Sequence, residues 1–435
     1  MSTVWLQIGQ CGNQVGQQWW DIVTRDEARR VFQAADGKLS ALCVDSEPKV
    51  IRRLRKEVQH GIFRDSNTIL GRGGRGGSWA LGYHGPPDSS HTDLVTATME
   101  SFRKEVERRD SFCGVVILHS LSGGTGSGLG SRLCEVIREE YPLGQVLAVT
   151  VCPHRAGENP VQNYNALLCL ARLDRFADGV LLFHNDEALC RGAQPGDGSR
   201  SLTAMNSHIA RCLAGLLTPV SNLHARSGVS IGLEPWELLR SVCPVPAIKF
   251  LHSAQANTRT MCWDGLVSSL LRSVLTRSPS GQAVSFPLLP DRLSARDAAL
   301  CEGRCYWSTA LLAVARGASP GPGPGSGLSS LYSLRTRLSR GYNCVTWNPR
   351  PVEYWSDPKN IIDVALPSRS LTVCANHSSV AEYMQHVVGR ARAMYQAGAY
   401  LHWYWRHGCE ESDFLQAFQQ LSCVEQEYST AVGSV

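Results

Sequence analysis

Long apolar runs are missing from this chain of 435 residues, and none approaches the length of about 18 residues that a membrane-spanning helix needs. The first residues, MSTVWLQIGQCG, have neither the basic start nor the long apolar centre of a secretory signal. The content of 43% hydrophobic and 19% charged residues is typical of a soluble globular protein. We therefore expect an intracellular, cytoplasmic protein without membrane insertion.

Paired metal-binding cysteines are also missing, because the 16 cysteines include no CxxC pair. Cys301 and Cys305 are the closest two, and no second pair or histidine cluster lies near them. Reduced structural thiols are a better interpretation than a zinc site. Basic residues gather at 52–56 and 103–109 in a chain of net charge +5. Acids are interleaved with them, so we interpret these runs as solvated helix faces and expect no nucleic-acid partner.

Short apolar runs alternate with helical patterns through the first half of the chain. Such an alternation predicts an α/β fold, in which helices cover both faces of a parallel sheet. The predicted strands are 3–9, 40–45, 113–120, 146–153 and 179–185, and the predicted helices are 11–30, 94–109, 129–141, 161–176 and 201–217.

A second sheet is predicted in the later part of the chain. Within it, residues 318–330 are too rich in proline and glycine to fold alone and are interpreted as a loop. Helical spacing follows at 379–398, and a final helical hairpin is predicted at 410–429. The predicted strands of this second sheet are 247–253, 305–316, 343–348 and 370–377.

The stretch LHSLSGGTGSGLGSR at 118–132 places a glycine-rich loop between a predicted buried strand and a predicted helix. Successive backbone N–H groups in such a loop, next to the positive end of a helix dipole, are suited to binding phosphates. The loop lacks the lysine of a P-loop and does not fit GxGxxG. A formal GxGxxG does occur at 71–76. No predicted strand leads into it and no clear helix follows, so we interpret it as a plain loop.

The segment GGTGSG at 123–128 resembles the signature loop of the tubulin and FtsZ superfamily. Further segments resemble tubulins in the same order, and the resemblance covers residues 3 to about 429. EVERRDSFCGV at 105–115 is more similar to delta and zeta tubulins than to alpha or beta tubulins. The other matching segments are QIGQCGNQVGQQWWD at 7–21, VDSEPKVI at 44–51, VQNYNALLCLARL at 161–173 and AYLHWYWRHGCEESDF at 399–414.

The resemblance implies a tubulin/FtsZ-like fold with three regions. Residues 1–217 would form a Rossmann-like, parallel-sheet domain that binds guanine nucleotide. Residues 218–378 would form a smaller intermediate α+β domain, and residues 379–435 a C-terminal helical region without an acidic tail.

The resemblance also assigns roles to individual residues around GTP or GDP. Asp45 and Glu47 would lie near Mg²⁺ and act mainly through water. Asn206 would read guanine, whereas Asp186, with Asn185 beside it, stands where tubulins have a second guanine-reading asparagine. Gln162 replaces a ribose-contacting glutamate, and Leu202 replaces an aromatic residue that stacks on the base. The residues expected at the phosphates and base are Gln10, Cys11, Gln14, Ser120, Gly123, Gly124, Thr125 and Gly126.

Hydrolysis in tubulins uses acids that the next subunit inserts. The matching stretch here retains Glu234 and Glu237. Glu237 is the candidate water-activating acid, acting in trans, so the chain is a possible GTPase. The alternative is that both are ordinary acids of a helix's first turn, where the dipole favours them.

The resemblance implies a GTP-binding structural component of centrioles or basal bodies, with weak or assembly-dependent hydrolysis. Its partners would be other tubulins or centriolar and basal-body proteins, within the microtubule cytoskeleton of the centrosome or cilium. Two alternatives remain. One is a self-assembling GTPase with turnover-driven filaments, and the other is a nucleotide-free scaffold, as the replacements at Leu202, Gln162 and Asp186 would allow.

Overall fold

The computed structural model describes residues 2–25, 27–57, 62–86, 93–155, 157, 159–192, 202–223, 234–260, 262–275, 306–317, 328–362 and 368–431. The chain divides into two compact units. The first is Met1–Ala210 with Ala381–Gln426, and the second is Arg211–Val380 with Glu427–Val435. The first unit thus ends inside helix α8 (Leu202–Leu217), and it takes in most of the C-terminal helices.

The first unit contains six parallel strands, five of which the alternating pattern predicts; the short strand β3 was not predicted. Their order β3-β2-β1-β4-β5-β6 runs outward from the centre in both directions, so the direction of winding reverses between β1 and β4. Ligands of open α/β sheets bind at the carboxyl ends of the strands next to such a reversal. The strands are β1 (Thr3–Ile8), β2 (Ala41–Asp45), β3 (Thr68–Leu70), β4 (Gly114–Ser120), β5 (Gln145–Cys152) and β6 (Gly179–His184).

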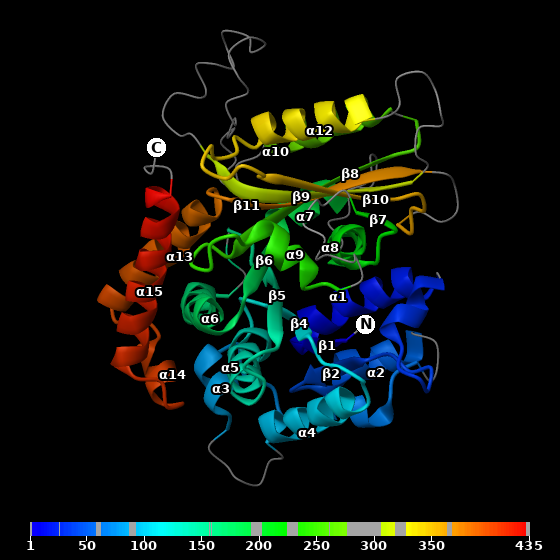
Figure 1. Cartoon of the computed structure of the whole chain (residues 1–435). Helices are drawn as coiled ribbons and strands as arrows, with labels where there is room; N and C mark the ends of the chain where they lie inside the picture. The colour runs from blue at the N-terminus through cyan, green and yellow to red at the C-terminus, as the bar shows by residue number, and fades with distance from the viewer. Residues whose placement is uncertain are drawn as a thin grey trace. The chain divides into compact units, whose positions relative to one another are not determined.

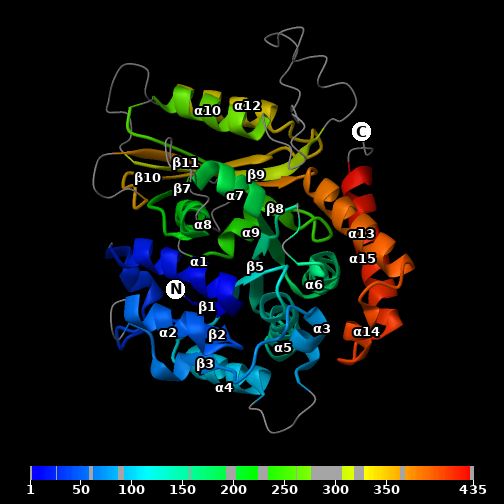
Figure 2. The ribbon, with the colours of Figure 1, turned by 180° about the vertical axis from the view of Figure 1, so that it is seen from behind.

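Helices cover both faces of these strands. Figures 1 and 2 show α1 (Gly9–Thr24) on one side, and α4 (Leu94–Glu107) and α5 (Gly130–Glu140) on the other. The apolar face of α1 is anchored by an aromatic stack, in which the ring centroids of Trp5 and Trp19 are 4.7 Å apart. The other helices of this unit are α2 (Pro48–Glu57), α3 (Trp79–His84), α6 (Gln162–Phe176), α7 (Asn185–Gly192), α14 (Leu401–Trp405) and most of α13 (Val380–Gln396) and α15 (Glu411–Thr430).

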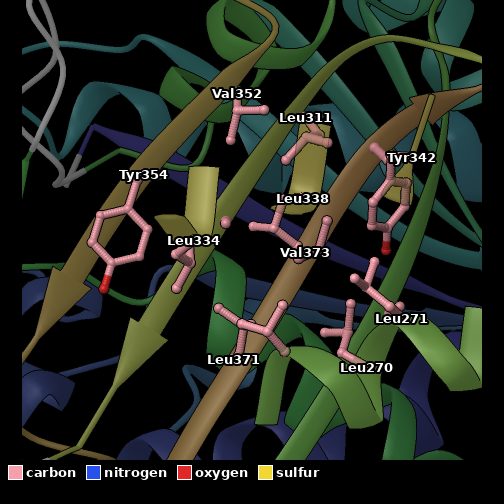
Figure 3. Close-up of a cluster of buried hydrophobic side chains, with 14 of the residues drawn as sticks. Leu270, Leu271, Leu311, Leu334, Leu338, Tyr342, Val352, Tyr354, Leu371 and Val373 are labelled. Carbon is pink, nitrogen blue, oxygen red and sulfur yellow. The ribbon is translucent and has the colours of Figure 1, made fainter. Parts of the chain in front are cut away.

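The second unit has a mixed sheet, in which β9 pairs with β10 in parallel and the other described pairs of strands are antiparallel. Buried side chains of the strands and of two helices form its core, seen in Figure 3 around Leu338 and Val373. Its elements are β7 (Asn222–Leu223), α9 (Glu237–Val242), β8 (Phe250–Thr258), α10 (Trp263–Leu275), β9 (Ser308–Arg316), α12 (Leu328–Gly341), β10 (Val352–Asp357) and β11 (Arg369–His377).

Two predictions about the later part of the chain are wrong. Residues 343–348 form a turn with a single bridge at Cys344, and the strand β10 starts after Pro351. This strand was not predicted because prolines stand just before it. A proline has no N–H to donate to a neighbouring strand, so it fits only outside the hydrogen-bonded part of a strand. Residues 410–429 are not a hairpin, since α15 is one continuous helix. That stretch contains no glycine or proline to turn the chain.

Other expectations about this part of the chain concern the loop, the thiols and the membrane. Of the loop expected at 318–330, residues 318–327 lie outside the described residues, and 328–330 begin α12. Cys301 and Cys305 are also outside them, and the described cysteines are thiols. None of the helices in the described ranges combines the length and apolar character of a bilayer-crossing segment.

Close backbone packing in the first unit depends on small residues. Helix α3 lies against the π-helical turn η3 (Thr125–Leu129). A Cβ at Gly128 would collide with the carbonyl oxygen of Trp79 and lie 2.7 Å from Cα of Gly82. The glycine at 128 is therefore required by this approach of two backbones, whatever ligand the neighbouring residues bind.

We expect Gly128→Ala to lower the free energy of unfolding by about 1–3 kcal/mol, because the added methyl group has no room. Gly389→Ala is the matched control, since Gly389 is exposed on α13 and its Cβ would meet open space. That change should raise the stability by up to about 1 kcal/mol, through helix propensity. Urea unfolding measures both, and equal stabilities of Gly128→Ala and the unmodified chain would contradict the packing argument.

Candidate functional site

A cavity of about 640 Å³ lies in the first unit at the carboxyl ends of its strands. Residues just after β1, β2, β4, β5 and β6 all contribute to its wall, together with residues from the first half of α8. This is the position that the reversal of strand order predicts for a ligand. The wall consists of Gln10, Cys11, Gln14, Asp45, Ser46, Glu47, Lys49, Val50, Arg75, Gly76, Gly77, Ser120, Ser122, Gly123, Gly124, Thr125, Gly126, Val151, His154, Asn185, Leu202, Met205 and Asn206.

Much of the glycine-rich segment is helical, whereas the sequence predicted a loop. After β4 ends at Ser120, only a short turn precedes η3, which runs directly into α5. The Ser127 backbone N–H and hydroxyl both donate to the carbonyl oxygen of Gly123, at 2.9 and 2.6 Å. The cavity therefore faces the beginning of a helix, where free backbone N–H groups and the helix dipole favour an anion.

The start of α1 is held against this turn. Gly9 has a φ of +73°, and a Cβ there would lie 3.1 Å from the backbone nitrogen of Gly126. Asn13 is buried and donates to the carbonyl oxygens of Gly9 and Val44, at 2.8 and 3.0 Å. These contacts present the first turns of α1 to the cavity, where Gln10, Cys11 and Gln14 lie. We did not predict a role for Asn13 from the sequence. Its position three residues after Gln10 is compatible with a role in holding the start of α1 in place.

The end of β2 and the glycine-rich turn bring oxygen atoms to the cavity wall. The hydroxyl groups of Ser46 and Thr125 are 2.6 Å apart and tie the end of β2 to the glycine-rich turn. Asp45 is 4% exposed, and burial raises the pKa of its carboxyl to about 6 against the opposing hydrogen bonds from the Glu47 and Ser46 amides. Glu47 is exposed, and its carboxylate lies against Gly74.

These oxygen donors suit a hard cation such as Mg²⁺ held largely through water. They do not make a closed metal cage, and no group of three or more His, Cys, Asp or Glu side chains in the described ranges is arranged to hold a metal.

Residues of α8, together with His154, form another part of the cavity wall. Asn206 and Met205 line it, and Leu202 does so with 61% of its surface exposed. Asn185 also lines the cavity at the end of β6. Asn206 and Asn185, both predicted from the sequence, are therefore brought to the same cavity.

Asp186 and Gln162, also predicted as binding residues, do not belong to the cavity wall. The two carboxylate oxygens of Asp186 lie 2.7 Å from Nδ1 of His154 and 3.0 Å from the backbone nitrogen of Arg155. Gln162 is buried and donates to the His154 carbonyl oxygen at 3.1 Å. Both side chains thus hold His154, which sequence reasoning missed and which itself faces the cavity.

Residues 71–77 also contribute to the cavity, against the interpretation as a plain loop. The strand β3 leads directly into this segment and α3 follows it. Both elements were missed because they have only three and six residues. Arg75, Gly76 and Gly77 from this segment line the cavity.

Glu234 and Glu237 belong to the second unit. The Glu237 carboxylate accepts a hydrogen bond of 3.1 Å from the Glu234 backbone N–H, and Glu237 is 1% exposed. This bond closes the turn that leads into α9, where the side chain of Glu237 satisfies a backbone N–H group. Their role as acids acting in trans stays a prediction.

The buried charge of Asp45 predicts a pH dependence of stability. The folded pKa of about 6 exceeds the unfolded value of 3.8, so the folded chain binds the extra proton between these values. Stability is therefore lost as the pH rises through this range, by up to about 3 kcal/mol. In the chain freed of nucleotide and metal, Asp45→Asn should be stabilising at pH 7.5, and progressively less so from pH 6 to 4. Urea unfolding across this range measures the difference, and a difference independent of pH would contradict the argument.

Comparisons with known proteins find similarity to tubulins. Residues 2–191 match the family model described as Tubulin/FtsZ family, GTPase domain. The tubulin delta chain of Homo sapiens is 27% identical, with 98% of this chain and 99% of that protein covered. The tubulin delta chain of Mus musculus is 27% identical, with 99% of each covered. The tubulin beta-4 chain of Zea mays is 26% identical, with 97% and 94% covered.

The matched domain includes the glycine-rich turn, the start of α1 and the acids after β2, and the delta and beta relatives extend the similarity along nearly the whole chain. The α/β fold, the parallel sheet and the position of the cavity are consistent with that match. Residues 2–191 therefore match a Tubulin/FtsZ-type GTPase domain, in a chain that is similar to delta tubulin along nearly its whole length.

Proposed function

We propose that this chain binds GTP or GDP in the cavity of its first unit and serves as a structural subunit of centriole- or basal-body-associated microtubule assemblies. The observation that carries the nucleotide proposal is the convergence of the glycine-rich helix start, the start of α1 and the acids after β2 on one cavity of about 640 Å³. This volume is in the usual range for small-molecule sites.

At the phosphate end, the backbone N–H groups at the start of η3 would donate to phosphate oxygens. The hydroxyls of Ser120 and Thr125 line the same wall and would add donors. Asp45 and Glu47 would hold Mg²⁺ through its waters, and the ion would supply positive charge to the phosphates. The positive charge of the bound ion would also stabilise the ionised form of the buried Asp45 carboxyl.

At the base end, an asparagine side chain offers both a donor and an acceptor, which fits the edge of guanine. Asn206 takes this role in our proposal, with Asn185 beside it on the wall. Asp186 is occupied by His154 and Arg155, so His154 rather than Asp186 would face the ligand. Leu202 offers aliphatic packing in place of an aromatic stack, which supports modest affinity, weaker by roughly 0.5–1.5 kcal/mol.

Slow hydrolysis in the isolated chain is part of the proposal. The carboxylate of Glu237 is engaged with the Glu234 amide at the beginning of its own helix. Turnover would require a neighbouring subunit to present this acid to the nucleotide in trans. An assembly-dependent reaction of this kind fits a structural subunit better than a freely turning-over filament.

The partners in this proposal are other tubulin subunits and centriolar or basal-body proteins. The similarity to delta tubulin chains supports a role outside the bulk microtubule wall. The net charge of +5 also supports a role outside the bulk microtubule wall. A chain with an overall positive charge does not present the negative electrostatic potential that attracts basic partners. A delta- or zeta-type assignment belongs to this proposal.

Base recognition gives a direct test. In equilibrium binding by calorimetry, the chain should prefer GTP to ATP, and Asn206→Ala should weaken GTP binding about tenfold, as expected for a lost hydrogen bond to a buried partner. Thr203→Ala is the matched control, because Thr203 is exposed on the same helix and outside the cavity wall. Equal affinity of the unmodified chain for GTP and ATP would contradict guanine recognition.

A further inference from the structure

Arg75 is a buried arginine in a segment that is otherwise largely exposed. It is 8% exposed, whereas Arg72, three residues earlier in the same turn between β3 and α3, is exposed. Arginine is almost never buried unless it is paired. The question is therefore what stabilises its charge.

The described part of the chain offers Arg75 no paired acid. No carboxylate there lies within 4 Å of its guanidinium, and its Nε is buried without a hydrogen-bond partner. Asp93 is the acid that acts on it electrostatically. The carboxylate of Asp93 is occupied at the start of α4, where it accepts from the backbone nitrogens of Val95 and Thr96.

A second buried arginine shows how hydrogen bonds to the backbone can stabilise a buried guanidinium group in this chain. Arg316 is 1% exposed, and its guanidinium donates to the carbonyl oxygens of Gly215, Thr218 and Pro219. Arg316 thus has a structural role that uses backbone acceptors. Arg75 makes no such bonds, and burial lowers the pKa of its guanidinium because the charge is poorly solvated.

The position of Arg75 indicates what its partner is. Arg75 is one of the residues that line the cavity, and its carbonyl oxygen would lie 2.5 Å from a Cβ at Gly124. Arg75 therefore adjoins the glycine-rich turn, at the phosphate end. Among the described lysine and arginine residues of the wall, the other is Lys49, which is exposed.

We propose that Arg75 is a phosphate-binding residue of this site, whose guanidinium donates to oxygens of the terminal phosphates from within the same chain. The inference rests on the proposed function for the identity of the nucleotide, but not for the binding of a polyphosphate. A guanidinium presents a planar fork of donors that matches phosphate oxygens. The energetic cost of burying it without a partner is recovered when the anion arrives.

The test compares Arg75→Gln with Arg72→Gln in the full chain, using GTP, guanosine and inorganic tripolyphosphate as calorimetric probes. Arg75→Gln should weaken GTP and tripolyphosphate binding about tenfold to a hundredfold, the usual range for lost hydrogen bonds to a charged group. Guanosine binding should be unchanged, and Arg72→Gln should behave as the unmodified chain. Arg75→Lys keeps the positive charge but not the planar guanidinium with its several donors, so its affinity for GTP and tripolyphosphate should be intermediate.

Thermal unfolding separates anion binding from a structural role. Because Arg75→Gln removes an uncompensated charge, the ligand-free midpoint should stay or rise, while the shift that GTP induces should shrink. A lower ligand-free midpoint with equal loss of guanosine and GTP binding would overturn the proposal, as would unchanged GTP affinity.

The nucleotide probes also distinguish this proposal from the guanine-binding function. Tripolyphosphate binding that depends on Arg75, without any guanosine or GTP preference, would leave the role of Arg75 standing and overturn guanine recognition. Absence of all binding to the unmodified chain would overturn both.

Discussion

The close approach of backbones around the glycine-rich turn is the constraint on which the site depends. The turn after β4 touches the start of α1 through Gly9 and Gly126, and it touches the segment before α3 through Gly124. The absence of a Cβ at these glycines lets the segments approach one another closely. The order of the strands brings the same turn to the centre of the sheet, between the ends of β1 and β5.

Two charged side chains of this cavity, Asp45 and Arg75, are buried in the chain without a ligand. Asp45 is buried with a raised pKa, and Arg75 is buried without a carboxylate within 4 Å in the described ranges. Each is a cost to folding that a hydrated cation or a phosphate would remove. By contrast, Asp186 and Gln162 both hydrogen-bond to His154, which lines the cavity. Binding of a charged ligand should therefore be strongly coupled to stability.

Much of this organisation could be predicted from residues alone. The apolar runs that became β1, β2, β4, β5 and β6 have the short, β-branched pattern of buried parallel strands, and the glycines at 123–128 marked the site. What the sequence did not reveal depends on tertiary context. Gln162 and Asp186 occupy positions predicted to touch a ligand, but their hydrogen bonds turn them toward His154. Arg75 was not predicted as a site residue because it lies in a glycine-rich stretch. The strand and helix that flank this stretch are too short to show a clear hydrophobic periodicity.

The most direct test is the nucleotide content of the purified chain. The protein is prepared with Mg²⁺ and denatured, and the released GTP, GDP, ATP and ADP are quantified per chain. The account predicts close to one guanine nucleotide per chain, mostly GTP, because the acid of Glu237 is not presented to the site in a lone subunit. An empty site, or adenine nucleotide in place of guanine, would contradict it.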